Sequence, residues 1–498
     1  MNEHEDFSLV IGKRAFLISL SILLVLIVLT GIMSIIIPSG TYRQINNEAG
    51  QKILVPDSFA YCDKPQYPIW RWFTAPLEVL TADGNTMIIT IIVFFLIIAG
   101  AVSIMIKSGV LHHAVKKLLE RYANQCFKLV RFLILVFMLF GSFLGIFEEA
   151  VLFIPLMVSL SLSLNWNKTI GLAISMGSTA MGFSAAITNP FTIGIAQKLA
   201  GLSLIDGAPA RIIVFIIIYV VYQWYVIRSI KKLEAQNNKR EHRDTLCVSA
   251  NTTTASIQTN SSTQTGMSDT NCTITIVQNA HNQEKALRFL YVCIFIMVLL
   301  VVLAPLIPVL SGISFPLIAL VFLMAGIGTG LISKLGSKTS LQAFGKGALD
   351  VGPGIILVLL AASIKHVMVR TKVLDTLIYF TVSAMQRTQP VVTALLIYLA
   401  VLVLNFFISS GSAKAFLIIP IITPIADLSG LSRNMAVLAY IFGDGFSNIL
   451  FPSNALLLIA LGIAGLDYKS WFKWIVPLEL IILFVTSLIL AAGIGLHW

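Results

Sequence analysis

The chain has 498 residues, of which 57% are hydrophobic and only 11% are charged, and this composition excludes an ordinary water-soluble globular protein. Its formal net charge of +11 would indicate a nucleic-acid partner in a soluble protein. Here basic loops that orient membrane helices explain the charge, and no nucleic-acid partner is expected. The five cysteines are scattered without metal-ligand spacing, which argues against a disulfide scaffold and a zinc site. Apolar stretches long enough to cross a bilayer recur along the chain and predict an all-α polytopic membrane protein.

The first two apolar spans set the orientation of the chain. The span at 15–37 follows Lys13 and Arg14, which places the N-terminus in the cytoplasm by the positive-inside rule. No small-residue cleavage pattern follows it, so we interpret it as a retained helix rather than a signal peptide. The span at 86–106 leads into a basic segment, 107–131, that predicts a helix lying at the cytoplasmic interface.

The next two apolar segments are interrupted by polar residues. Two short arms within 132–164 meet at Glu148 and Glu149. The basic residues that flank them favour one re-entrant hairpin entering from the cytoplasm over two full spans. The segment 169–200 is broken by a Thr-Asn-Pro sequence at 188–190, which predicts a discontinuous helix.

A polar tract separates the two halves of the chain. Residues 229–286 are rich in Thr, Ser, Asn and Gln, and predict a disordered cytoplasmic linker. A span at 211–228 precedes this linker. After it come a connecting span at 287–310, spans at 315–333 and 349–369, apolar arms at 391–408 and 415–426, a broken segment at 434–465 and a final span at 471–497.

The two halves share a pattern. Laying 149–189 over 414–454 needs no gap and places Pro155 on Pro420, and Asn189 on Asn454. In both halves a charged hairpin tip is followed by a proline on the returning arm and then by a span broken at a hydroxyl-Asn pair. The pattern predicts an internal repeat.

The connecting span at 287–310 adds one crossing between the repeats, so the second repeat begins on the opposite side of the membrane. We therefore expect an inverted-topology repeat, with residues 1–228 as the first unit and 311–498 as the second, and with two re-entrant hairpins and two discontinuous helices. This architecture is typical of secondary transporters, whose substrate site lies near the midplane between the repeats.

Candidate site residues are the polar groups at the two tips and the two breaks, because polar and ionisable groups at membrane depth are costly and exposed helix ends can bind ions. They are Ser142, Glu148, Glu149, Ser178, Thr179, Thr188, Asn189, Ser410, Gly411, Ser412, Lys414, Asp444, Ser447, Asn448, Ser453 and Asn454.

Three charged candidates have alternative interpretations. Glu148 and Glu149 either form a solvated turn at the interface or hold a cationic group at a cavity. Lys414 either snorkels to the interface, pairs with one of these glutamates or meets a substrate carboxylate. Asp444, the only acidic residue of its span, is either a cation ligand or the partner of a basic residue elsewhere. The paired breaks could also be simple proline kinks, although their equivalent positions favour binding sites.

Other functions are less well supported by the sequence. The sequence FGDG at 442–445 resembles the GxGD motif of intramembrane aspartyl proteases, but Ile441 stands where that motif has glycine and no Tyr-Asp partner occurs on another span. A channel or a structural membrane protein would not require paired broken repeats. No enzyme activity is expected.

Four segments resemble the YfcC group of bacterial transporters, which is related to the DcuC-type C4-dicarboxylate carriers of the ion transporter superfamily. They are GSFLGIFEEAVLFIP (141–155), GFSAAITNPFTIGIAQ (182–197), ISSGSAKAFLIIPIITPIADL (408–428) and GDGFSNILFPSN (443–454). The resemblance implies an elevator-type secondary carrier, commonly a homodimer, in the bacterial cytoplasmic membrane. Ala413 and Ser453 depart from the usual motifs.

The resemblance leaves two substrate classes, because members of the group are described as carriers of basic amino acids or of C4-dicarboxylates. The carboxylate pair at the first tip favours a cationic amino acid, and arginine/ornithine exchange is the predicted function. The alternative is a carboxylate carrier coupled to Na⁺ or H⁺. No other cofactor is expected, and Na⁺ would bind near Asn189 and Asn454.

Overall fold

The computed structural model describes residues 13–46, 52–82, 86–122, 125–145, 147–251, 269–303, 308–383, 385, 388–496 and 498. Among these residues, eight helices are long and apolar enough to cross a bilayer. The predicted all-α polytopic membrane protein is thereby confirmed. Large apolar side chains on the outer surface of these helices, such as Val25 and Phe295, suit contact with lipid.

The helices are interspersed with short π-helical or 3₁₀-helical segments, labelled η. The first half comprises α1 (Lys13–Ile36), β1 (Gly40–Thr41), β2 (Gln44–Asn46), β3 (Lys52–Leu54), β4 (Ala60–Tyr61), α2 (Trp70–Thr81), α3 (Thr86–Lys107), α4 (Val110–Tyr122), α5 (Cys126–Leu139), η1 (Phe140–Leu144), η2 (Glu148–Phe153), α6 (Ile154–Ser163), α7 (Lys168–Leu172), η3 (Ala173–Gly177), α8 (Ser178–Ser184), η4 (Pro190–Gly194), α9 (Ile195–Leu199) and α10 (Ala208–Asn251). The second half comprises α11 (Asp269–Leu303), α12 (Pro308–Ile332), α13 (Ser337–Asp350), α14 (Gly352–Arg370), α15 (Val373–Ser383), α16 (Pro390–Phe407), α17 (Gly411–Ser429), α18 (Arg433–Gly445), η6 (Phe446–Ile449), α19 (Ala455–Ala464) and α20 (Tyr468–Gly495).

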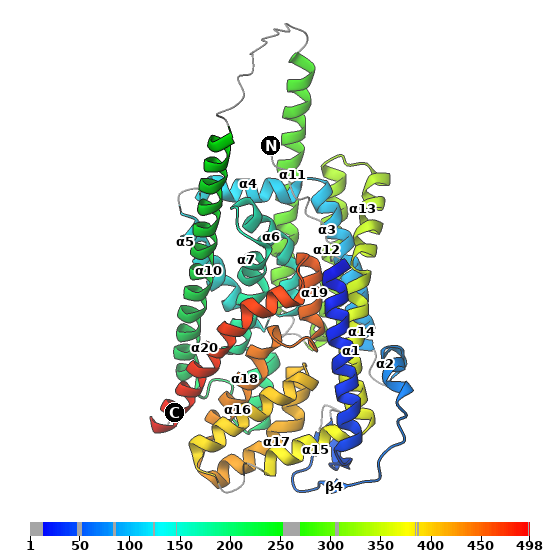
Figure 1. Cartoon of the computed structure of the whole chain (residues 1–498), viewed down its shortest axis with the longest axis vertical. Helices are drawn as coiled ribbons and strands as arrows, with labels where there is room; N and C mark the ends of the chain where they lie inside the picture. Colours follow the sequence, from blue (N-terminus) through cyan, green and yellow to red (C-terminus); the bar gives the residue numbers. More distant parts are fainter. Residues whose placement is uncertain are drawn as a thin grey trace.

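The two ends of the helix bundle differ. Helix α4 lies across the end beyond which α10 and α11 project, whereas α15 and the strands lie at the other end (Figure 1). Helix α4 falls within the segment predicted to lie at the cytoplasmic interface. Helices α5 and α6 lie in the half of the bundle next to α4, and α16 and α17 lie in the opposite half (Figure 1).

The strand end is held together by aromatic and ionic contacts. Strands β1 and β4 pair antiparallel, as do β2 and β3. The ring of Phe59, which precedes β4, stacks on Tyr379 of α15 with centroids 4.1 Å apart. On α2, hydrogen bonds of 2.9 and 2.7 Å from the Arg71 guanidinium hold the pKa of Glu78 at about 2. Glu78 also contacts His366 of α14 at 3.3 Å, which ties α2 to the bundle.

Residues 229–286 are predicted to be a disordered linker, but the structure has helices at both ends of this range. The stretch 252–268 lies outside the described residues. Helix α10 continues to Asn251 and α11 begins at Asp269. Strong helix formers such as Lys, Leu, Glu, Ala and Gln follow residue 229 and let α10 continue beyond the apolar span. Glu284 of α11 also accepts a hydrogen bond of 2.8 Å from Lys117 of α4, which lowers the pKa of Glu284 to about 2.

The first hairpin packs closely on the first broken helix because glycines line the contact. A Cβ at Gly141 would lie 2.2 Å from the backbone oxygen of Thr179, and one at Gly182 would lie 1.9 Å from that of Met138. Such distances are possible only where the side chain is a hydrogen atom. The segment α5–η1 therefore meets α8 backbone to backbone.

Replacing Gly182 by Ala should separate these two helices. No backbone can accommodate a carbon atom 1.9 Å away, so we expect α5 or α8 to shift and the protein to lose about 1–3 kcal/mol of stability or more. The melting temperature in detergent measures this loss. Gly345→Ala is the matched control, because its Cβ would meet nothing within 4 Å, and its melting temperature should stay unchanged or rise. Equal melting temperatures for both variants would contradict the packing described.

The hairpin tip and the first break are also joined by hydrogen bonds. The backbone oxygen of Ser142 accepts from the N–H groups of Ile187, Thr188 and Asn189 at 3.0–3.2 Å. The Ser142 hydroxyl donates to the carbonyl of Ala185 at 2.8 Å and accepts from the N–H of Ile187 at 3.0 Å. Ser142 thus provides hydrogen-bond partners for three N–H groups and one carbonyl that the break in the helix exposes.

The two breaks end in the same way. After the first, the Asn189 side-chain oxygen accepts from the N–H of Phe191 at 2.9 Å, and after the second, that of Asn454 accepts from Leu456 at 3.0 Å. Each asparagine caps the helical segment that follows. The two asparagines thus have the same capping role, and the internal repeat stays a prediction.

The broken helices of the two halves touch each other. A Cβ at Gly445, the last residue of α18, would lie 2.4 Å from the Ser184 hydroxyl oxygen at the end of α8. Helix α17 likewise packs on η4 and α9. Both discontinuities therefore lie in one region of the bundle.

Candidate functional site

A buried ion pair lies where the two breaks meet. The ammonium of Lys414 is 2.7 Å from Oδ1 of Asp444, and the two side chains are 0% and 1% exposed. Taking two charges out of water is expensive, and their mutual attraction repays the cost only when the surrounding hydrogen bonds are good. A buried ion pair often adds no net stability to the fold. Ionisable residues inside a membrane protein commonly mark functional sites, so this pair is the candidate site.

Local helix geometry makes the position of Lys414 more costly still. Helix α17 begins at Gly411, after Ser410, whose hydroxyl accepts from the N–H of Ala413 at 3.5 Å as a long N-cap. Lys414 therefore lies in the first turn, at the positive end of the helix dipole. A cation there is unfavourable unless a carboxylate neutralises it, and Asp444 of α18 supplies that charge.

An amide network surrounds the pair. Lys414 donates to the side-chain oxygen of Asn405, near the end of α16. The Asn405 amide nitrogen in turn donates to Ser447 at 2.7 Å and to Asn448 at 3.1 Å. Asn454 donates to the same oxygen of Asn448 at 3.3 Å. This chain of hydrogen bonds links the second hairpin to both sides of the second break.

The site retains unused hydrogen-bonding capacity. Within the described part of the chain, four buried polar atoms near the two breaks have no hydrogen-bond partner. They are the Asn189 amide nitrogen, the Thr192 hydroxyl, Oδ2 of Asp444 and the Ser453 hydroxyl. Buried polar groups normally have hydrogen-bond partners. Unpartnered donors and acceptors near the two breaks therefore suggest a position for a polar ligand.

Gly411 lies beside two of the residues that carry these atoms, Asp444 and Thr192. A Cβ at Gly411 would lie 2.5 Å from Oδ2 of Asp444 and 3.0 Å from the methyl carbon of Thr192. The carbonyl of Gly411 accepts a hydrogen bond of 2.6 Å from Tyr440, which fixes the hairpin tip. Thr192 of η4 and Asp444 of α18 therefore both lie beside Gly411.

The predicted candidates separate into three groups. The structure brings together six of them at or beside the ion pair, namely Gly411, Lys414, Asp444, Ser447, Asn448 and Asn454. Asn189 and Ser453 lie at the two breaks, and each has an unpartnered buried polar atom. Six others have hydroxyls that are already hydrogen-bonded. Ser178 and Thr179 donate to backbone carbonyls of their own segment, and Ser410 and Ser412 contact each other. Ser142 and Thr188 join the first hairpin tip to the first break.

The two glutamates of the first tip form the third group. The side chain of Glu148 lies outside the described residues. Glu149 is partly exposed in η2 and already takes part in an interaction. Lys414 pairs with Asp444 of α18, the helix that packs on α17.

Three residues at the site were not predicted. Asn405 is the only amide in the arm 391–408, and that isolation in an apolar run is a signal in the sequence. Tyr440 and Thr192 give no comparable signal, since lone hydroxyls are common in membrane helices.

The side chains at the breaks fit poorly to the predicted Na⁺ positions. The side-chain oxygens of Asn189 and Asn454 already accept backbone hydrogen bonds as helix caps. The remaining free atom of Asn189 is its amide nitrogen, a donor, whereas Na⁺ requires oxygen ligands. Binding of Na⁺ near Asn189 and Asn454 stays a prediction.

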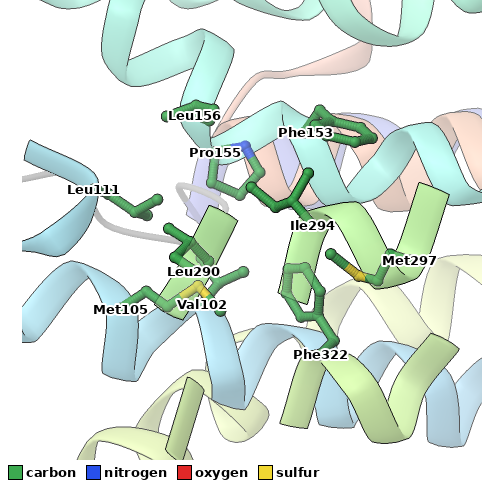
Figure 2. Close-up of a pocket in the computed structure, with 10 residues that line it drawn as sticks. All are labelled: Val102, Met105, Leu111, Phe153, Pro155, Leu156, Leu290, Ile294, Met297 and Phe322. Atoms are coloured by element: carbon green, nitrogen blue, oxygen red, sulfur yellow. The ribbon is translucent and has the colours of Figure 1, made fainter. Parts of the chain in front are cut away.

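A separate hollow in the protein is apolar. It lies between the arm formed by η2 and α6 and the helices α3, α4, α11 and α12 (Figure 2). Its lining residues are Val102, Met105, Leu111, Phe153, Pro155, Leu156, Leu290, Ile294, Met297 and Phe322. A charged substrate would find no polar partner there, so this hollow is not the candidate site.

Comparison with known proteins gives consistent matches over most of the chain. A family described as "C4-dicarboxylate anaerobic carrier" (DcuC) matches residues 16–494. The chain is 25% identical to a protein of Escherichia coli K12 described as "Putative basic amino acid antiporter YfcC", over 95% of each chain. It is 22% identical to an uncharacterised protein of Haemophilus influenzae, over 83% of this chain and 77% of the other.

Two solved structures are also similar to the chain. The YdaH transporter of Alcanivorax borkumensis gives a TM-score of 0.41 at 16% identity, over 98% of this chain and 99% of that one. MtrF of Neisseria gonorrhoeae, described within a class of antimetabolite efflux pumps, gives 0.40 at 16% identity, over 95% and 94%.

Proposed function

Because the chain belongs to the C4-dicarboxylate anaerobic carrier (DcuC) family of membrane transporters, we propose that it transports amino acids across the bacterial cytoplasmic membrane and exchanges arginine for ornithine. The observation that carries this proposal is the buried Lys414–Asp444 pair, whose carboxylate keeps one oxygen unpartnered within the described residues.

The pair complements an α-amino acid. In a bound amino acid the α-carboxylate would pair with the ammonium of Lys414, and the α-ammonium with Asp444. Exchanging one ion pair for two charge-assisted contacts avoids leaving either buried charge alone. The free donor on Asn189 and the free hydroxyls of Thr192 and Ser453 offer further hydrogen bonds to the same groups.

The side chain of a basic amino acid would extend toward further carboxylates. Glu148 and Glu149 follow the tip of the first hairpin, and Ser142 joins that tip to the first break. A guanidinium or ammonium group suits such carboxylates. The similarity to a protein described as a basic amino acid antiporter supports the same substrate class.

Transport would follow an elevator-type movement of an inverted repeat. The two hairpins lie in opposite halves of the bundle (Figure 1), and both pack on broken helices that meet at the ion pair. The hollow beside the first hairpin is lined by apolar side chains. Such side chains make no hydrogen bonds that movement of the hairpin past the neighbouring helices would have to break. We extend the proposal to a homodimer with the N-terminus in the cytoplasm.

A carboxylate carrier is the second candidate. Lys414 and the Asn189 amide nitrogen are donors that suit a dicarboxylate, in keeping with the family description. A second carboxylate would, however, approach the unpartnered oxygen of Asp444, and like charges repel at such distances. The amino acid is therefore favoured.

Counterflow in proteoliposomes separates the two functions. Vesicles preloaded with ornithine should take up labelled arginine, while vesicles without internal amino acid should not. Succinate should not compete. Uptake that succinate inhibits, that ornithine leaves unchanged and that requires an ion gradient would replace this proposal with the carboxylate carrier.

A further inference from the structure

Helix α20 carries a single acidic residue, Glu479, in the middle of an otherwise apolar span. Its Oε1 is buried and has no hydrogen-bond partner. Among the described residues, none of the ion pairs includes Glu479. It takes no part in the network around Lys414, so the proposed substrate site does not account for it.

An isolated carboxylate in such a place does not stay charged. Without a cation or a hydrogen-bond donor, the ionised form is far less stable than the neutral form, and the group takes up a proton instead. Acidic residues inside membrane spans commonly mark proton relays or ion pathways for this reason.

The helices packed against α20 bring no compensating cation to Glu479. Helix α1 has no charged residue after Arg14, and α16 and η6 contain none. On α18, Arg433 pairs with Asp427, and Asp444 with Lys414. On α10, Arg211 donates to the carbonyls of Asp206 and Leu204, and the Arg228 guanidinium lies over the ring of Trp224. The described lysine side chains of α10 and α20 are exposed, namely Lys231, Lys232, Lys469 and Lys473.

Helix α20 packs on α10 and α16, which carry Tyr222 and Tyr398 respectively. Each tyrosine also contacts one of the broken helices. Tyr222 donates a hydrogen bond of 2.7 Å to the carbonyl of Ala173 in η3, just before α8. The backbone oxygen of Tyr398 would lie 2.6 Å from a Cβ at Gly443, the residue before Asp444.

We propose that Glu479 is a proton-binding site that couples protonation to the positions of the two broken helices during transport. Release of the proton to water breaks the carboxyl O–H bond and leaves a carboxylate on α20, the helix that packs on α10 and α16, and rebinding reverses the step. A charge appearing there would be stabilised only by movement of α20 relative to α10 and α16. The rate of exchange should then follow the protonation of this one group. The inference rests on the proposed transport function.

Infrared difference spectroscopy tests the protonation without any substrate. The purified protein at about neutral pH should show a carboxylic-acid C=O band that shifts on deuteration and is lost in Glu479→Gln. Glu120→Gln, which removes an exposed carboxylate, should leave this band unchanged. An identical band in wild type and Glu479→Gln would overturn the proposal.

Counterflow at equal pH on both sides of the vesicle membrane tests the coupling. The wild-type rate should change with pH as the titration of a single group, whereas the Glu479→Gln rate should vary less than about twofold over the same range. Glu479→Asp should restore the pH dependence. A Glu479→Gln protein with the full wild-type pH profile would contradict the coupling. If the wild type shows no arginine counterflow, the proposed substrate is wrong, and the infrared result still decides the protonation of Glu479.

Discussion

Replacing Asp444 by Asn is expected to abolish arginine exchange at ordinary substrate concentrations. The substitution removes the charge that meets the α-ammonium of the substrate, and a buried charged contact contributes about 2 kcal/mol or more, which corresponds to about 30-fold or more in affinity. Counterflow measured over a range of arginine concentrations gives the change in half-saturation. Wild-type kinetics in Asp444→Asn would remove Asp444 from the substrate site.

A second variant separates transport from folding. Asp444→Asn leaves the ammonium of Lys414 buried without a counter-charge, and breaking a buried pair in this way costs about 3–5 kcal/mol. The double variant Lys414→Met with Asp444→Leu removes both charges and should recover the melting temperature in detergent, since apolar replacement of a buried pair is often neutral or stabilising. It should still not transport. A double variant that exchanges arginine would show that the pair is only structural.

Gly411→Ala should also block transport while keeping both charged residues of the ion pair in the chain. The added methyl group would lie 2.5 Å from Oδ2 of Asp444 and 3.0 Å from Thr192, so it would fill the position proposed for the substrate ammonium. We expect at least a tenfold loss of exchange, equivalent to about 1.4 kcal/mol of binding. Counterflow again provides the measurement.

The control for Gly411→Ala comes from the same neighbourhood. A Cβ at Gly194, two residues after Thr192, would find its closest neighbour at 3.5 Å, an ordinary van der Waals distance. Gly194→Ala should therefore transport normally. If both variants transport equally well, the space beside Gly411 is not used by the substrate.

Much of the fold could be predicted from the sequence because membrane constraints are strict. Uncharged spans, basic loops and the broken segments 169–200 and 434–465 are visible as composition, and the structure contains breaks at both places. The matching roles of Asn189 and Asn454 follow from a simple alignment of the two halves. Residues 229–251 were predicted to be unstructured because a polar composition does not reveal where a long helix such as α10 ends.

The site was harder to predict, since it depends on distances between segments that are far apart in the chain. Lys414 and Asp444 were both candidates, yet the sequence left open whether they pair with each other. Thr192 could not be identified at all, because only the packing of α17 on η4 places it beside Gly411. Glu479 was not among the predicted site residues, because α20 is unbroken and has no counterpart in the predicted pattern of hairpin tips and breaks.

The location of the substrate between the two breaks can be measured directly by chemical protection. Thr192→Cys, in a chain whose five native cysteines are replaced by serine, places a thiol beside Gly411. Arginine at about ten times its Kd should slow the reaction of this thiol with a small maleimide by about tenfold. Ser203→Cys, on the exposed loop between α9 and α10, should react at the same rate with and without arginine. An unchanged rate at position 192, in a protein that still exchanges arginine, would show that the substrate binds elsewhere.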